Sequence, residues 1–167
     1  GFHCAFDAET GEELWRMHSC PEDEWVGDTY KISGGTNWMT PTLDAEREML
    51  YMAIGNPSPD FNGTVRPGPN RNTCSTLAVD LNTGDIEWLH QESSHDIWDY
   101  DSANQRLIVR DAEVEHRDYE GDIVDNAGKT SWGYTMNPDT GELLERSEPL
   151  TQQINFQEMV PHVDEER

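Results

Sequence analysis

Short runs of apolar residues, broken at close intervals by turn residues, make up most of the chain. Short runs with frequent punctuation are typical of strands, and no segment carries a long helical period. Strand-like runs lie at 40–43, 49–54, 107–109 and 132–136, and a longer run, 76–91, contains its own turn. The pattern therefore predicts an all-β protein.

One sequence pattern recurs and predicts the architecture. It spans residues 5–15, returns at 78–88, and appears in degenerate form at 135–144. Each copy reads as a strand, a tight turn that ends in Thr-Gly, and a second strand, because glycine supplies the positive φ that hairpin turns require. We expect the tryptophan that ends the first two copies to dock on the neighbouring unit, whereas the third copy has Glu145 there. Repeats of this kind in a radial array build a β-propeller with four-stranded blades.

The charge of the chain narrows the range of partners. Acidic residues number 34 against 11 basic ones, which gives a formal charge of −23. Such a charge disfavours nucleic acid and anionic membranes as partners. The acids are dispersed and Lys31 and Lys129 are the only lysines, so we expect a halophilic source, because the Debye length falls to about 3 Å at 1 M salt.

The chain shows no membrane-spanning segment, since no apolar run approaches the roughly 20 residues that a bilayer requires. No signal peptide is present, but Gly1 is not a natural start, so export stays open. The cysteines Cys4, Cys20 and Cys74 have no metal-type spacing. A Cys4–Cys20 pair and buried free thiols are both compatible with the sequence.

An acidic stretch at 94–101 is the strongest candidate for chemistry. Side chains at i and i+2 of extended backbone point the same way. Asp99 and Asp101 are therefore expected to converge on one cation or reacting centre, with Trp98 and Tyr100 on the other side. The alternatives are a solvated acidic loop and a metal-dependent hydrolase, although no nucleophile or histidine cluster supports a hydrolase.

Four motifs in order give the stretch a context. They are the Gly-Gly-Thr-Asn-Trp of 34–38, the Gly-Asn-Pro-Ser-Pro of 55–59, the Arg-Pro-Gly of 66–68 and the His-Asp-Ile-Trp-Asp-Tyr of 95–100. In this order they resemble the alcohol dehydrogenases that depend on pyrroloquinoline quinone (PQQ), the methanol and ethanol dehydrogenase family.

The resemblance covers residues 1–144 and implies an eight-bladed propeller, of which this chain would supply about three four-stranded blades as an internal fragment. Residues 145–167 would begin a further blade or form a disordered tail. The family implies a periplasmic, extracellular or cell-surface location.

The resemblance also implies how the quinone is held. Trp38 matches the tryptophan on which the ring system stacks, and Thr36 matches the residue whose hydroxyl bonds a PQQ carboxylate. Lys129 lies where the family places a cation near the quinone oxygens, which would stabilise negative charge on the reduced cofactor. Ordinary strand or core positions are the alternatives for each.

Asp99 matches the catalytic base of the family and, with Asn56, a ligand of the metal ion. Asp101 resembles an additional aspartate typical of lanthanide-dependent members, whereas calcium-dependent relatives carry a small residue there. A trivalent ion requires one more anionic oxygen and polarises a carbonyl more strongly. The metal is thus expected to be a lanthanide or Ca²⁺. A further glutamate ligand and a vicinal cysteine pair of the family would lie outside this chain.

The resemblance thus implies a quinoprotein that oxidises a primary alcohol by hydride transfer to metal-bound PQQ, although the fragment alone is expected to be inactive. Its partners would be a small alcohol and a separate electron acceptor such as a cytochrome, because the chain has no Cys-x-x-Cys-His haem motif. His95 and Asp96 are expected to support the acidic loop, and Arg66 and Asn70 to fix the loop of Asn56. The alternative is a non-catalytic propeller that serves as a protein-interaction scaffold.

Overall fold

The computed structural model describes residues 1–150, apart from the side chain of Glu115. The fold is all-β, as predicted, with short 3₁₀ turns as its only helices in that range. Its strands are β1 (Phe2–Phe6), β2 (Glu13–His18), β3 (Thr42–Asp44), β4 (Met49–Ile54), β5 (Ser75–Asp80), β6 (Ile86–Gln91), β7 (Leu107–Val114), β8 (Tyr119–Ala127), β9 (Gly133–Met136) and β10 (Leu143–Arg146). The 3₁₀ turns are η1 (Glu22–Glu24), η2 (Gly27–Ile32), η3 (Gly63–Val65) and η4 (Glu115–Arg117).

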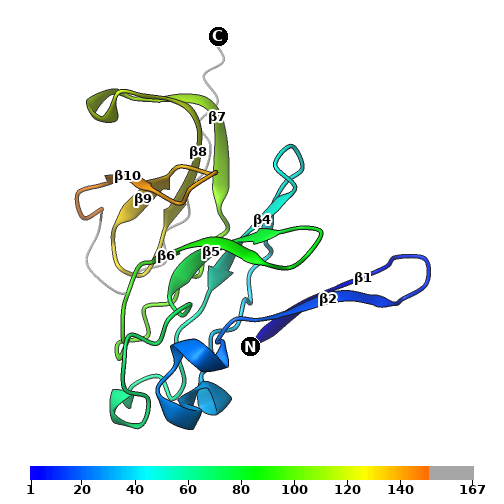
Figure 1. The fold of residues 1–167 in the computed structure, drawn as a ribbon. Helices are drawn as coiled ribbons and strands as arrows, with labels where there is room; N and C mark the ends of the chain where they lie inside the picture. Colours follow the sequence, from blue (N-terminus) through cyan, green and yellow to red (C-terminus); the bar gives the residue numbers. More distant parts are fainter. Residues whose placement is uncertain (151–167) are drawn as a thin grey trace.

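The strands form three antiparallel sheets in chain order (Figure 1). The first is the hairpin β1–β2, the second is the meander β3-β4-β5-β6, and the third is the meander β7-β8-β9-β10. The predicted three units are confirmed, although the first contains two described strands and not four. The long strand β8 was not predicted, because its sequence is interrupted by Gly121 and by acidic residues. The predicted segment 145–167 begins inside β10, and its part from 151 onward lies outside the described residues.

The Thr-Gly turns of the repeat close three of the hairpins as predicted. In each turn one short polar side chain, that of Asp7, Asp80 or Asn137, accepts hydrogen bonds from the backbone two and three residues later. The glycine that follows has φ between 71° and 78° in all three copies, the left-handed region that a residue with a Cβ avoids. One local rule thus produces the same hairpin in every sheet.

The tryptophans dock each sheet on the next one, which confirms the expectation from the repeat. Trp15 donates a hydrogen bond from Nε1 to the Leu81 carbonyl at 2.9 Å, and Trp88 makes the equivalent bond to the Pro138 carbonyl at 2.9 Å. A Cβ on Gly84 or on Gly141 would lie 2.6 Å from the indole ring packed against it. The glycine therefore serves both the turn and the docking of the preceding unit.

Apolar cores also join each sheet to the next one along the chain. One core joins Met17 of β2 to the second sheet, and another joins the second sheet to the third. The latter core consists of Met49, Tyr51, Ala78, Trp88, Val124, Tyr134 and Met136. These cores lie between successive sheets, as blade-on-blade packing requires.

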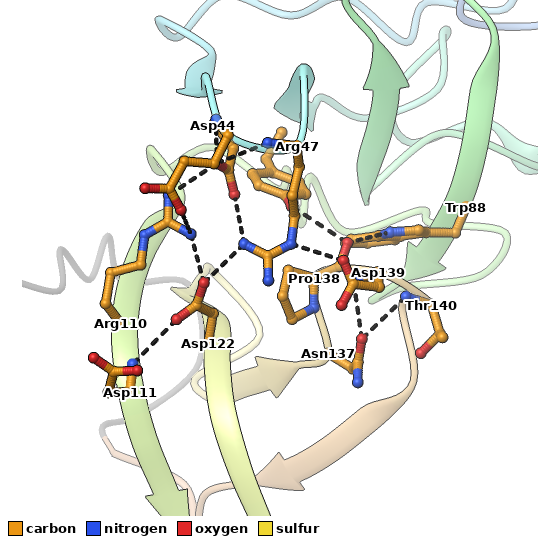
Figure 2. A network of polar contacts seen from close by, with 12 residues as sticks. Asp44, Arg47, Trp88, Arg110, Asp111, Asp122, Asn137, Pro138, Asp139 and Thr140 are labelled. Carbon is orange, nitrogen blue, oxygen red and sulfur yellow. Dashed lines mark hydrogen bonds and ion pairs between the residues drawn. The ribbon is translucent and has the colours of Figure 1, made fainter.

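An ion-pair network closes the edge of the interface between the second and third sheets (Figure 2). Arg47 contacts Asp44 at 3.1 Å, Asp122 at 2.8 Å and Asp139 at 2.7 Å. Arg110 contacts the same Asp44 at 2.8 Å and Asp122 at 2.5 Å. We call these five residues the interblade cluster. It joins β3 and the turn after it to β7, β8 and the turn before β10.

Candidate active site

Alternation along the meanders places every second connection at the same end of the sheets. These connections are the long segments 19–41, 55–74 and 92–106 and the short segment 128–132, and the first three gather at the bottom of Figure 1. The segments at 33–36 and 55–58 pair through backbone hydrogen bonds, such as the one from the Gly55 amide to the Thr36 carbonyl at 2.9 Å. All predicted site residues lie on these four connections.

Asp96 builds the acidic loop. Its fully buried carboxylate accepts hydrogen bonds from the backbone amides of Trp98 at 3.3 Å and of Asp99 and Tyr100, both at 3.1 Å. A side chain that satisfies three successive amides fixes a tight loop without regular structure. The predicted supporting role of Asp96 is confirmed.

Two further residues attach the acidic loop to the connection that carries Asn56. Arg66 is fully buried and donates to Asn70 Oδ1 at 2.7 Å and to the carbonyl of Asp96 at 2.5 Å. His95 contacts the Gly68 carbonyl through Nδ1 at 2.8 Å. The predicted structural roles of Arg66, Asn70 and His95 are therefore confirmed.

At the centre of the site, Lys129 lies between two carboxylates. Its Nζ is 2.6 Å from Asp101 Oδ2 and 3.3 Å from Asp99 Oδ2. The other oxygen of Asp101 accepts the backbone amide of Asn56 at 2.7 Å. Asp99, Asp101, Asn56 and Lys129 thus form one group drawn from three connections.

The convergence of Asp99 and Asp101 is confirmed, but the predicted reason for it is wrong. Asp99 has a left-handed φ of 69°, so this backbone is not an extended strand. The loop imposed by Asp96 turns both carboxylates toward Lys129. Trp98 and Tyr100 stack on each other with ring centroids 5.8 Å apart.

The group is electrostatically uneven. Burial raises the pKa of Asp99, the neighbouring Asp101 charge raises it further, and Lys129 offsets only part of this rise. Burial alone would lower the pKa of Lys129, but its hydrogen bond to Asp101 and the charges of both aspartates raise it. Two carboxylates share one ammonium here, so one negative charge remains uncompensated.

Gly55 is where the quinone-binding and metal-binding candidates meet. A Cβ on this residue would lie 2.9 Å from Asp101 Oδ1, 3.0 Å from the Thr36 carbonyl and 3.5 Å from Trp38 Nε1. Trp38 is 53% exposed, and Thr36 is exposed as well. The structure therefore brings the Trp38 indole next to Asp101, and it places Thr36 there through its backbone.

The side-chain oxygens of Asp99, Asp101 and Asn56 are of the kind that binds a hard cation. Carboxylate and amide oxygens are the ligands that Ca²⁺ and ions of similar size prefer. The Asn56 amide nitrogen is buried without a hydrogen-bond partner, and a half-turn of the amide would place its oxygen at that position. Among residues 1–150, no three acidic, histidine or cysteine side chains converge as a metal site. The chain thus presents two carboxylates and one amide, which fit one side of such a site.

The three cysteines resolve as free thiols, so the possible Cys4–Cys20 pair does not form. Cys20 lies under the backbone of the 34–38 motif, with Sγ 3.9 Å from the Gly34 carbonyl. Burial raises the pKa of the Cys20 thiol and, more strongly, that of Cys74. Both thiols behave as packing groups.

Sequence reasoning missed a buried charged pair beneath this group. Glu92 and Arg106 are both fully buried and lie 3.0 Å apart. In so acidic a chain, one glutamate after a strand carries no distinguishing signal. The role of Gly55 was also missed, although its place inside the Gly-Asn-Pro motif was a signal that could have revealed it.

Comparison with known families agrees with this geometry. Residues 1–151 match the family described as "PQQ: Glucose/ethanol/alcohol dehydrogenase, beta-propeller domain". No helix among the described residues has the length and hydropathy needed to cross a membrane.

Individual relatives belong to the same group. The chain is 32% identical to the quinohemoprotein alcohol dehydrogenase ADH-IIG of Pseudomonas putida, over 86% of this chain and 22% of the relative. It is 28% identical to the lanthanide-dependent methanol dehydrogenase of Methylorubrum extorquens, over 87% of this chain and 28% of the relative. A solved europium-containing methanol dehydrogenase superposes with a TM-score of 0.78 at 25% identity, covering 89% of this chain and 29% of that structure. The chain spans about a quarter of the length of these relatives.

Proposed function

The chain belongs to the β-propeller family of PQQ-dependent glucose, ethanol and alcohol dehydrogenases, and we propose that it contributes one face of the active site of a quinoprotein that oxidises a primary alcohol. The observation that supports this proposal is the group of Asp99, Asp101 and Asn56 around Lys129. A propeller that served only as a scaffold would have no use for a partly compensated pair of carboxylates beside an exposed tryptophan.

In this proposal Asp99 is the general base. The Asp99 side chain is 39% exposed, so an alcohol hydroxyl can reach its carboxylate. A positioned carboxylate can remove the hydroxyl proton. A bound PQQ with its metal ion would supply the acceptor for the hydride of the alcohol carbon. Trp38 provides the flat apolar surface for the ring system, and Thr36 supplies a hydroxyl for one of its carboxylates. Lys129 stabilises negative charge that develops nearby.

Asn56, Asp99 and Asp101 would hold the cation in this proposal, and Asp101 favours a lanthanide over Ca²⁺. Its oxygens already bond the Asn56 amide and Lys129, but each carboxylate oxygen has a second lone pair for a cation. The electron acceptor would be a separate redox protein, and the location periplasmic or at the cell surface.

The test uses the complete protein that contains this chain, freed of metal and then supplied with PQQ. We expect dye-linked oxidation of a primary alcohol to be restored by La³⁺ far better than by Ca²⁺, and the Asp101→Ala variant to lose that preference. Equal activation by Ca²⁺ in both proteins would remove Asp101 from the metal site. A protein that neither alters the absorbance of PQQ nor oxidises alcohols would point to a scaffold instead.

A further inference from the structure

Beneath the group around Lys129 lies a second, buried polar cluster. The side chain of Glu92 is fully buried, and its Oε1 accepts hydrogen bonds from Ser102 Oγ at 2.5 Å, Asn126 Nδ2 at 2.7 Å and Arg106 Nη2 at 3.0 Å. Arg106 is equally buried and donates to Thr76 Oγ1 at 2.7 and 2.9 Å and to Ser102 Oγ. A buried carboxylate and guanidinium are costly to desolvate, so each depends on the partners that the other holds in place.

The partners of this cluster lie next to the site residues in the chain. Ser102 directly follows Asp101, and the segment after Asn126 leads through Gly128 to Lys129. A Cβ on Gly128 would lie 3.0 Å from Glu92 Oε2 and 3.7 Å from the Asp101 carbonyl. The two backbone segments that carry Asp101 and Lys129 therefore meet directly above Glu92.

A third link closes the arrangement. Asn104, two residues before Arg106, donates through Nδ2 to the Ala127 carbonyl at 2.5 Å, and Arg106 bonds the Asn104 carbonyl in turn. The segments 101–106 and 126–129 are thus joined at two levels. Glu92 bridges Ser102 and Asn126, and Asn104, whose carbonyl Arg106 bonds, contacts Ala127 directly.

We propose that Glu92 and Arg106 form a positioning pair that fixes Asp101 and Lys129 relative to each other. The pair would thereby also fix the Lys129 ammonium group beside Asp99. This inference rests on the proposed function, in which Asp101 and Lys129 take part. Neither residue of the pair would contact the substrate or cofactor. The pair would act by setting the 2.6 Å contact between Asp101 and Lys129, since displacements of about 1 Å in a site can cost about 100-fold in rate.

The Asn56 amide reports on the position of Asp101 without any cofactor, because it donates to Asp101 Oδ1. In the complete protein free of PQQ and metal, we expect Glu92→Gln to speed hydrogen exchange at this amide about tenfold. The Leu81 amide, which bonds the Glu48 carbonyl at the far end of the same sheet, should keep its rate. Ser102→Ala removes one joint at little cost to folding and should give a smaller change of the same kind, which keeps the test decisive if Glu92→Gln fails to fold.

Asp44→Asn is the matched control, because Asp44 is an equally buried carboxylate bonded by two guanidinium groups. It should lower the Tm without changing exchange at Asn56. With PQQ and La³⁺, Glu92→Gln should lower kcat about tenfold with little change in KM. Unchanged exchange at Asn56 in both Glu92→Gln and Ser102→Ala would overturn the positioning role. Wild-type protein without alcohol oxidation would overturn the proposed function alone, since exchange at Asn56 still decides whether the pair positions Asp101.

Discussion

Two clusters of aspartates in this chain differ in how their charge is compensated. In the interblade cluster, Asp44 and Asp122 are each bonded by both Arg47 and Arg110 (Figure 2). Near Lys129, two aspartates share a single ammonium group.

The pKa values follow this difference. Hydrogen bonds from the two arginines lower the pKa of Asp122 well below its usual range. Burial opposes that effect at Asp44, yet the arginines still lower its pKa. At Asp99, by contrast, burial and the second aspartate raise the pKa, and one lysine cannot compensate. The aspartates that contact two guanidinium groups therefore have lowered pKa values, whereas the aspartate that shares one ammonium group with a second carboxylate has a raised one.

The largest effect should follow from Asp99→Asn in the complete protein. Asparagine keeps the shape of the side chain but cannot accept the hydroxyl proton, so kcat should fall about 10² to 10⁴-fold. PQQ binding, measured by absorbance, should persist. Retention of most of kcat would mean that another group is the base.

The matching change in the other cluster should act on stability and not on turnover. Asp44→Asn leaves Arg47 and Arg110 with one anionic partner fewer at a side chain with 0% exposure, which should cost about 2–4 kcal/mol in the free energy of unfolding. Chemical denaturation measures this loss, and kcat of the remaining folded enzyme should stay within about twofold of wild type. A large loss of kcat would show that the two clusters are coupled.

A steric change sharpens the comparison further. The Cβ of Gly55→Ala would displace Asp101 or the Thr36 backbone, so kcat/KM should fall about 10-fold or more with a small change in Tm. Gly133→Ala is a suitable control, because its Cβ would first meet the flexible side chain of Ser147 at 3.3 Å. If the two variants have the same kcat/KM, the close packing at Gly55 is not required for activity.

The sequence was informative wherever a local rule repeats. The Thr-Gly turn, its polar first residue and the docking tryptophan are encoded within eleven consecutive positions, so the hairpins and the docking of one unit on the next could be predicted from pattern alone. Asp99, Asp101 and Asn56 could be selected as candidate site residues from the sequence, because each lies in a motif that is contiguous in the chain.

Long-range pairing of charges could not be predicted in the same way. Glu92 reaches Asn126 across 34 positions, and Arg47 reaches Asp139 across 92. In a chain with 34 acidic residues, nothing local distinguishes a buried carboxylate from a solvated one. The length of β8 was missed for a related reason, since pairing with β7 and β9 on either side stabilises a strand whose own sequence favours it weakly.

The smallest effect, and the most specific to the comparison, concerns the pH dependence of stability without cofactor. The pKa of Asp99 in the folded protein lies above its unfolded value, so its protonated form is favoured in the fold, and the ionised form opposes folding as pH rises above about 4. Asp44 and Asp122 have lowered pKa values, so the stability they provide is present above about pH 4 and is lost as pH falls through their folded values.

In PQQ-free and metal-free protein near neutral pH, Asp99→Asn should therefore raise the Tm slightly, by about one or two degrees because the partly exposed group is screened by solvent. The gain should vanish near pH 3, where wild-type Asp99 is protonated, whereas Asp44→Asn should lower the Tm at neutral pH and approach wild type only in acid. Thermal melts of the three proteins across this pH range test both signs at once, and an Asp99→Asn protein that is less stable than wild type at neutral pH would show that Lys129 compensates both carboxylates after all.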